Sequence, residues 1–337
     1  MGDQRTTAAS AAAAAGGVPG NAIGIDIGGT KIGAGVVDHR GEILAQTRRE
    51  TPASHPDAIT EAVADAVEEL ATTHEFGPVG VGVAGFVDAA RSSVVFAPNL
   101  AWRDEPLRAR LEPLLGRRVV VENDANAAAW AEYRFGGGLD EHGLPVDDLL
   151  MLTVGTGLGA GIVSGGVLQR GANGAAAELG HVRAVPDGRA CGCGNAGCWE
   201  QYVSGNALVR EARDLLRSGD PSAEQLLRAV GGDPEAVDGP TVTRLAQGGD
   251  PAAARLLAEV GRWLGEAVAS FVAVLDPEVV VVGGGVSHAG ELLLAPARAS
   301  LAANLPGRTH RRPPPLRTAR RGNAAGIVGA ADLARTA

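Results

Sequence analysis

The sequence predicts an α/β protein that is large enough for two domains. Short β-branched runs alternate with longer segments of helical periodicity along the chain. One motif, an apolar strand followed by a Gly/Thr turn and a second apolar strand, begins at Ala22 and again at Leu149. The chain of 337 residues exceeds the usual length of one domain.

The composition is typical of a globular protein, with 45% hydrophobic and 20% charged residues. A net charge of −9 argues against a nucleic-acid-binding surface, and no apolar run is long enough to span a membrane. Residues 1–20 form an Ala/Gly-rich leader, which we expect to be disordered and not a signal peptide. The odd number of cysteines and the lack of an export signal predict a cytoplasmic location.

The first copy of the motif contains a candidate phosphate-binding turn. We expect strands at Ala22–Ile27, Ile32–Asp38 and Glu42–Arg49, with Gly28, Gly29, Thr30 and Lys31 between the first two. Backbone N–H groups of a Gly-Gly-Thr turn can surround phosphate oxygens, and Asp26 beside them can organise Mg²⁺ through water. An ordinary hairpin turn is the alternative interpretation.

Another candidate polar residue, Asn99, follows in the same half of the chain. A helix is expected over His55–His74 and a buried strand over Pro78–Gly85. The segment Phe96–Asn99 is expected to be a loop, where Asn99 offers the donor and the acceptor that sugar hydroxyls require.

Asn123 and Asp124 follow the β-branched run Arg118–Val121 and precede a predicted helix at Ala127–Tyr133. A strand that ends at a helix N-terminus places such side chains at the carboxyl edge of a sheet, where α/β proteins bind ligands. Asp124 could instead be the N-cap of the helix, and that role conflicts with catalysis because backbone N–H groups would occupy the carboxylate.

The second copy of the motif predicts strands at Leu149–Val154, Ala160–Val163 and Val167–Arg170, with the turn Gly155–Gly159 after the first. This turn also fits the dinucleotide fingerprint G-x-G-x-x-A. No helix follows it, so a Rossmann fold is rejected.

All three cysteines lie in the segment Glu178–Glu200. Cys191, Cys193 and Cys198, together with His181, form the ligand set of a closed tetrahedral Zn²⁺ site. Four protein ligands leave no position for water, so this zinc would be structural and would hold Glu178, His181 and Glu200 at a polar pocket. Three reduced cysteines in a loop are the alternative.

The remaining sequence predicts mostly helices, a strand and a Gly-rich turn. The strand Glu278–Val282 leads into Gly283–Gly285, whose lack of side chains would let a flat ring lie against the backbone. The expected helices are Gly205–Ser218, Ser222–Val230, Thr241–Gln247, Pro251–Leu275, Ala289–Leu305 and Ala324–Ala334.

Together these motifs resemble the actin-like ATPase superfamily, which has a ribonuclease-H-like fold. The patterns E-x-G-H at 178–181 and C-x-C-G-x-x-G-C-x-E at 191–200 are similar to those of ROK-family sugar kinases, the glucokinase members above all. The likeness covers Ile23 to about Ala330. It implies two lobes around a cleft, each lobe a mixed sheet with flanking helices. The expected small lobe is 21–135 plus 320–337, and the large lobe is 136–319 with a zinc-binding segment at 181–198.

The resemblance also implies an activity, the ATP-dependent phosphorylation of the 6-hydroxyl of glucose, with Mg²⁺ as cofactor. Asp124 would be the general base, and a homodimer or homotetramer is expected. The implied hexose contacts are Asn99, Asn123, Asp124, Glu178, His181 and Glu200. The implied ATP and Mg²⁺ contacts are Asp26, Gly28, Gly29, Thr30, Lys31, Thr156, Gly157, Gly284 and Gly285, and the implied zinc ligands are His181, Cys191, Cys193 and Cys198.

Three alternatives to a glucokinase stay open at this point. The chain could phosphorylate N-acetylmannosamine, mannose or fructose, or use polyphosphate as donor, because the walls of the pocket also decide specificity. A non-catalytic sugar-responsive regulator is the alternative from another class. Repressors of the family carry an N-terminal helix-turn-helix domain, and the roughly twenty residues before the first strand are too few for one.

Overall fold

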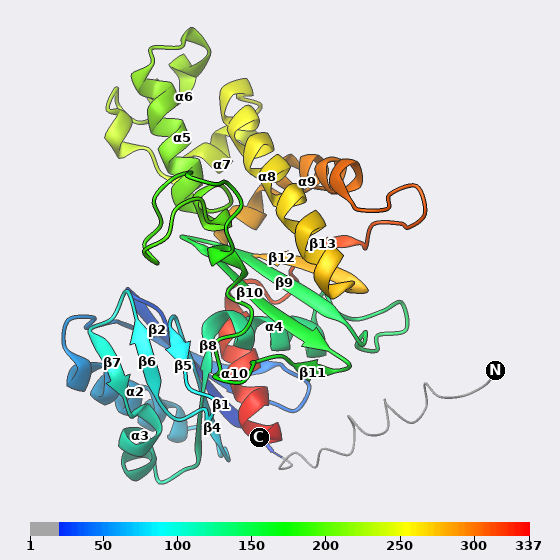
Figure 1. Cartoon of the computed structure of the whole chain (residues 1–337). Coiled ribbons are helices and arrows are strands. Elements are labelled where there is room, and N and C mark those ends of the chain that lie inside the picture. The colour runs from blue at the N-terminus through cyan, green and yellow to red at the C-terminus, as the bar shows by residue number, and fades with distance from the viewer. Residues whose placement is uncertain (1–19) are drawn as a thin grey trace. The chain divides into compact units, whose positions relative to one another are not determined.

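The computed structural model describes residues 20–337, so the predicted leader lies outside the described residues apart from Gly20 (Figure 1). The chain divides into two compact units. Of the described residues, unit 1 takes those up to Asp147, Gly161–Ala177 and Asn323–Ala337, and unit 2 takes Asp148–Ala160 and Glu178–Gly322. The lobe boundaries expected from the sequence stay a prediction.

Unit 1 contains a five-stranded sheet with the order β3-β2-β1-β4-β8. β1 is antiparallel to β2 but parallel to β4, and β4 is parallel to β8. Ile27 lies opposite Val83, which lies opposite Asn123, so β1, β4 and β8 end at one edge of the sheet. The strands are β1 (Ala22–Ile27), β2 (Lys31–Val37), β3 (Ile43–Glu50), β4 (Val79–Val83) and β8 (Val119–Asn123).

The two faces of this sheet differ because side chains alternate along each strand. Ile23, Ile25 and Ile27 of β1 join a core that includes residues of α2 (Pro56–Ala71) and α3 (Leu107–Leu115). Gly24, which alternates with these isoleucines, faces α10 (Ala325–Thr336). A Cβ at Gly24 would come within 1.8 Å of the Ile327 carbonyl oxygen. Helix α10 therefore lies directly on the sheet (Figure 1).

A small antiparallel sheet with the order β5-β6-β7 also belongs to unit 1. Its strands are β5 (Phe86–Val87), β6 (Val94–Ala97) and β7 (Trp102–Glu105). The prediction of a loop over Phe96–Asn99 is therefore wrong for Phe96 and Ala97. Phe96 pairs with Phe86 and Arg103, and the strand ends directly before Pro98.

The second sheet has the order β11-β10-β9-β12-β13, and the chain passes from unit 2 to unit 1 within β10. β12 is parallel to both β9 and β13, with Gly283 opposite Thr153, so β9 and β12 end at the same edge. The strands are β9 (Leu149–Val154), β10 (Leu158–Ser164), β11 (Val167–Leu168), β12 (Val279–Gly283) and β13 (Leu316–Thr318).

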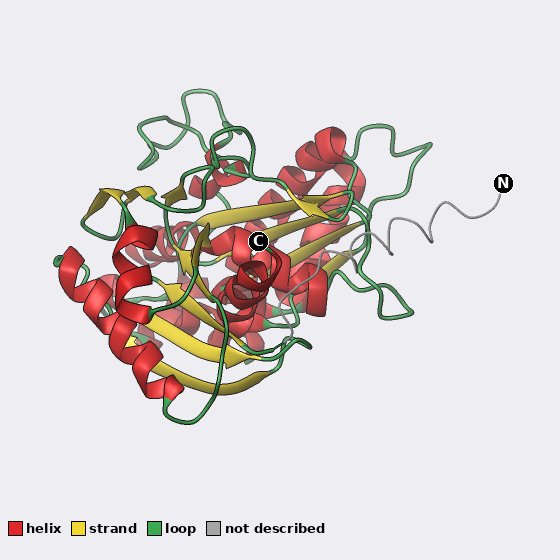
Figure 2. Cartoon of the chain, turned by 90° about the horizontal axis from the view of Figure 1, so that it is seen from below, coloured by secondary structure: helices red, strands yellow, loops and turns green. Residues whose placement is uncertain are grey.

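The longest helix described in unit 2 is α8, which spans the predicted range Pro251–Leu275 and buries many of its apolar side chains. Asp250 caps its N-terminus by accepting a hydrogen bond from the Ala253 N–H at 2.7 Å. α9 packs along α8, as Figure 1 shows, and Figure 2 shows helices beside the strands of the sheets. The other helices of unit 2 are α5 (Gly205–Arg217), α6 (Glu224–Ala229), α7 (Gly239–Gln247) and α9 (Glu291–Asn304). Over residues 20–337, no helix combines the length and apolar character needed to cross a bilayer.

Candidate functional site

Asp26 and the following turn form the first part of the candidate site, in unit 1. Asp26 is the penultimate residue of β1 and lies on the face covered by α10, next to Gly326. Burial raises the pKa of its carboxyl group from 3.8 to about 6. The Gly28 N–H donates to the Lys31 carbonyl oxygen at 2.9 Å and closes the turn. A Cβ at Gly29 would lie 3.0 Å from Asn99 Cβ, so the structure brings Asn99 against this turn.

Asn123 and Asp124 form the second part, at the same edge of the unit 1 sheet. Asn123 is the N-cap of α4 (Asp124–Phe135): its Oδ1 accepts from the Asn126 N–H at 3.0 Å, and its Nδ2 donates to the Gly85 carbonyl oxygen at 3.1 Å. The alternative in which Asp124 caps the helix is therefore wrong. Asp124 is the first residue of α4 and is partly exposed, where the positive end of the helix stabilises a carboxylate.

Glu122, just before these two residues, is held by a buried ion pair network that the sequence did not reveal. Its side chain is 1% exposed. Oε2 lies 2.8 Å from Arg170 Nε and 3.1 Å from Arg91 Nε, and Oε1 accepts from the Asn123 N–H and from Asn126 Nδ2. Because the arginines come from distant parts of the chain, no spacing rule could have found them.

The predicted metal ligands are gathered in unit 2. One ligand atom from each of His181, Cys191, Cys193 and Cys198 lies within 4.8 Å of all the others. His181 Nδ1 is 3.6 Å from Cys191 Sγ, and the sulfurs of Cys193 and Cys198 are 3.7 Å apart. Ligands about 2.3 Å from a tetrahedral zinc ion are separated by roughly 3.8 Å. The geometry therefore fits zinc.

The chemistry of the three thiols also suits a cation. Burial, together with the neighbouring thiols of Cys193 and Cys191, raises the pKa of Cys198 to about 12. Three thiols this close cannot all ionise beside one another in the absence of a positive charge. A divalent ion would supply that charge, and the sulfurs would bind it as thiolates.

Glu178 and Glu200 lie in the same unit as the cysteines. Glu178 precedes a turn of 3₁₀-helix at Leu179–His181, and Glu200 lies in another at Trp199–Gln201. Burial raises the pKa of Glu178, the negative charge of Glu200 raises it further, and His181 lowers it. Glu200 Oε2 accepts a hydrogen bond from the Leu158 N–H at 3.1 Å.

The second Gly-rich turn and the Gly284–Gly285 turn lie at one edge of the unit 2 sheet. The Gly155 N–H donates to the Gly157 carbonyl oxygen at 3.0 Å, and Thr156 between them is exposed. A Cβ at Gly284 would approach the Val154 carbonyl to 2.5 Å, so this turn lies against the end of β9. The structure therefore brings the Gly155–Gly157 turn and the Gly284–Gly285 turn to the same edge of the sheet, and their role as ATP contacts stays a prediction.

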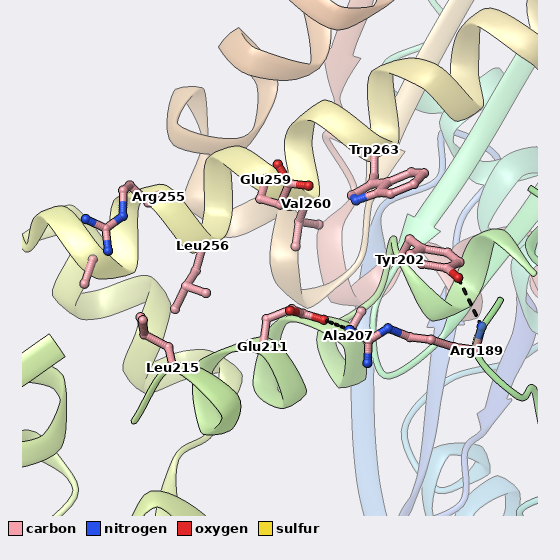
Figure 3. A pocket seen from close by; sticks show the side chains of 11 residues that line it. Arg189, Tyr202, Ala207, Glu211, Leu215, Arg255, Leu256, Glu259, Val260 and Trp263 are labelled. Carbon is pink, nitrogen blue, oxygen red and sulfur yellow. Dashed lines mark hydrogen bonds and ion pairs between the residues drawn. The ribbon is translucent and has the colours of Figure 1, made fainter. Parts of the chain in front are cut away.

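A cavity of about 350 Å³ in unit 2 is lined by none of the residues expected to form the functional site (Figure 3). α5 and α8 line it, together with Arg189 and Tyr202. The Tyr202 and Trp263 rings lie 4.6 Å apart, and the Arg189 N–H donates to the Tyr202 hydroxyl at 3.1 Å. The grouping of polar side chains, and not this cavity, marks the candidate site.

Known proteins resemble the chain over almost its whole length. A family model described as the ROK family matches residues 22–337. A glucokinase from Streptomyces coelicolor is 49% identical over 313 residues, which is 93% of this chain and 97% of that protein. A glucokinase from Thermotoga maritima is 36% identical over 278 residues, 82% of this chain and 85% of that protein. The crystal structure of a ROK family glucokinase from Streptomyces griseus in complex with glucose and AMPPNP matches with a TM-score of 0.86 at 47% identity, covering 94% of this chain and 100% of that one.

Proposed function

Because the chain belongs to the ROK family, we propose that it is a glucokinase, which transfers the γ-phosphoryl group of ATP to the 6-hydroxyl of glucose. The similarity to the Streptomyces glucokinases, one of them bound to glucose and AMPPNP, supports both substrates. One structural observation carries the proposal: Asp124 begins α4 at the same edge of the sheet as the end of β1, where Asp26 and the Gly28–Gly29 turn lie. A base and a phosphate-binding turn therefore share one edge of unit 1.

Asp124 is the general base in this proposal. Its carboxylate accepts the proton of the glucose 6-hydroxyl while that oxygen forms a bond to the γ-phosphorus and the bond to ADP breaks. The backbone N–H groups around Gly28, Gly29 and Thr30 hold phosphate oxygens, with Lys31 nearby as a cation. Mg²⁺ would neutralise the phosphate charge beside Asp26.

The hexose contacts are Asn99, Asn123, Glu178, His181 and Glu200. Asn123 has one amide hydrogen left for a hydroxyl, because the other faces Gly85 and its oxygen caps α4. His181 directs Nδ1 at the cysteine sulfurs, so Nε2 is the ring nitrogen available to a hydroxyl. Polar groups that pair with every hydroxyl reject analogues that lack one.

The zinc ion is structural, since its four protein ligands leave no position for substrate. Thiolate ligands require a reducing compartment, so a cytoplasmic location is part of the proposal. A homodimer or homotetramer is also part of it, and light scattering of the purified chain tests that state.

A coupled ADP-release assay across a hexose panel, with ATP and polyphosphate compared as donors, tests the function. We expect glucose with ATP to have the highest kcat/KM. The proposal fails if no hexose stimulates ADP release. It also fails if N-acetylmannosamine, mannose or fructose exceeds glucose, or if polyphosphate exceeds ATP, by about tenfold, a difference of 1.4 kcal/mol in transition-state binding.

A further inference from the structure

Glu200 makes contacts that a role as a hexose ligand does not require. Its Oε2 accepts a hydrogen bond from the N–H of Leu158, the residue that directly follows the Gly155–Gly157 turn. Its Oε1 lies 3.9 Å from Cys191 Sγ. One carboxylate thus contacts both the backbone next to the second phosphate-binding turn and a predicted zinc ligand, all within unit 2.

Gly157 is the residue whose missing side chain makes room for this carboxylate. A Cβ at position 157 would lie 2.2 Å from Glu200 Oε2 and 3.1 Å from its Cδ. The carboxyl group therefore fills the space beside the turn and packs on its backbone. The turn is also tied to the start of α5, where the Gly205 N–H donates to the Gly155 carbonyl oxygen at 2.7 Å.

The residues before Glu200 hold it in this position. Cys198 is a predicted zinc ligand, and Trp199 is 7% exposed. The Trp199 ring packs edge-on against Trp263 and Phe271, with centroids 6.2 and 6.3 Å away. The backbone N–H of Trp199 donates to the Val182 carbonyl oxygen at 3.0 Å. The packing and hydrogen bond of Trp199 anchor the backbone next to Glu200, and the Glu200 carboxylate contacts the end of the Gly155–Gly157 turn at Leu158.

We infer that Glu200 is a positioning residue for the donor phosphates: its carboxylate fixes the Gly155–Leu158 turn in the conformation that binds ATP. This inference rests on the proposed kinase function and extends it, because a residue expected to contact the hexose also sets the affinity for the nucleotide. Hydrogen bonds to an ionised acceptor are the stronger ones in proteins, and a turn that loses one becomes less ordered.

Calorimetric binding of AMPPNP without any hexose tests this role, since no sugar contact can then contribute. We expect Glu200→Ala to raise the Kd for AMPPNP about tenfold, the effect of losing one charge-assisted hydrogen bond. Glu200→Gln should stay within about threefold of the parent protein, because the amide oxygen can still accept from the Leu158 N–H. Asp238→Ala is the matched control: it removes a carboxylate that accepts from the Thr241 N–H at 2.8 Å elsewhere in unit 2, and it should leave the Kd unchanged.

A double substitution tests the steric half of the inference. Gly157→Ala should weaken AMPPNP binding by displacing the carboxylate, but in the Glu200→Ala background it should add nothing, because the space is then free. The inference is overturned if Glu200→Ala binds AMPPNP as the parent does, if Asp238→Ala weakens binding equally, or if the two effects simply add. A parent protein that binds no AMPPNP would instead refute the proposed function itself.

Discussion

Gly326, near the start of α10, lies so close to the Asp26 carboxyl group that a Cβ at position 326 would be 2.8 Å from Asp26 Cγ. The two residues are separated by almost the whole chain, yet the helix leaves just the room that this carboxylate occupies. The end of β1, where the Mg²⁺-organising group is proposed, therefore depends on the last helix.

Gly326→Ala tests this dependence. Alanine favours the helix, but its methyl group should rotate or displace the short Asp26 side chain, so we expect normal folding and a kcat about 100-fold lower. Steady-state kinetics and thermal unfolding give the two readouts. Gly239→Ala in α7, where a Cβ would meet no atom within 4 Å, should leave kcat unchanged; an equally active Gly326→Ala enzyme would contradict the argument.

Asp26→Asn should make the protein more stable at neutral pH. Since burial raises the pKa of Asp26 from 3.8 to about 6, the folded state binds this proton more tightly than the unfolded state does. The stability from this group is complete below pH 4, is lost as the pH rises through about 6, and stays lost above it. The variant should therefore gain up to about 3 kcal/mol at pH 8 and nothing at pH 4. Urea unfolding at both pH values without ATP checks this, and a gain that is larger at pH 4 would refute it.

Asp124→Asn should abolish turnover and preserve the fold. The amide keeps the shape of the side chain but cannot accept a proton, so kcat should fall by about 10³-fold, within the range for a general base. Calorimetry should show glucose affinity close to that of the parent. Asp65→Asn on the exposed face of α2 should be fully active, and a rate for Asp124→Asn within a few-fold of the parent would end the base assignment.

Removal of zinc should lower stability and glucose affinity together. The proposed metal would cross-link the segment that carries Glu178, His181 and Glu200, so its loss would free the proposed hexose contacts as well as the backbone. Metal analysis of carefully purified protein should find one zinc per chain. Chelation, or Cys198→Ser, should lower Tm and raise the Kd for glucose, whereas protein without stoichiometric zinc would contradict the site.

Arg170→Met should destabilise unit 1 through the buried Glu122 carboxylate. Its Oε2 loses the nearer of its two guanidinium partners, at 2.8 Å, and a buried charge that loses a partner costs about 3 kcal/mol. Equilibrium unfolding in urea measures the difference. Arg40→Met at an exposed position should change the free energy of unfolding by no more than about 0.5 kcal/mol, and an equal effect of both substitutions would show that the ion pairs contribute nothing specific.

Local patterns in the sequence were enough to predict most of the strands and helices and the grouping of His181 with the three cysteines. The strand Ala22–Ile27 and the helix Pro251–Leu275 begin and end where their periodicity predicts. The cysteines could be paired with His181 because soft ligands so close in sequence can reach one ion whatever surrounds them. The segment Phe96–Ala97 was missed because β6 is only four residues long and ends directly before Pro98, and a proline is a strong local signal for a loop.

Short motifs were therefore enough to predict which chemical groups the candidate site contains. Residue type and spacing alone place a carboxylate after a strand and three sulfurs in a loop. Only the tertiary structure decided what holds those groups. In the structure, Asn123 caps α4 and the buried Glu122 carboxylate pairs with arginines. Gly326 lies against the Asp26 carboxyl group, and Glu200 accepts a hydrogen bond from the Leu158 N–H. Each of these joins residues through packing of separate elements, and the free energy of such contacts depends on neighbours that no local pattern encodes.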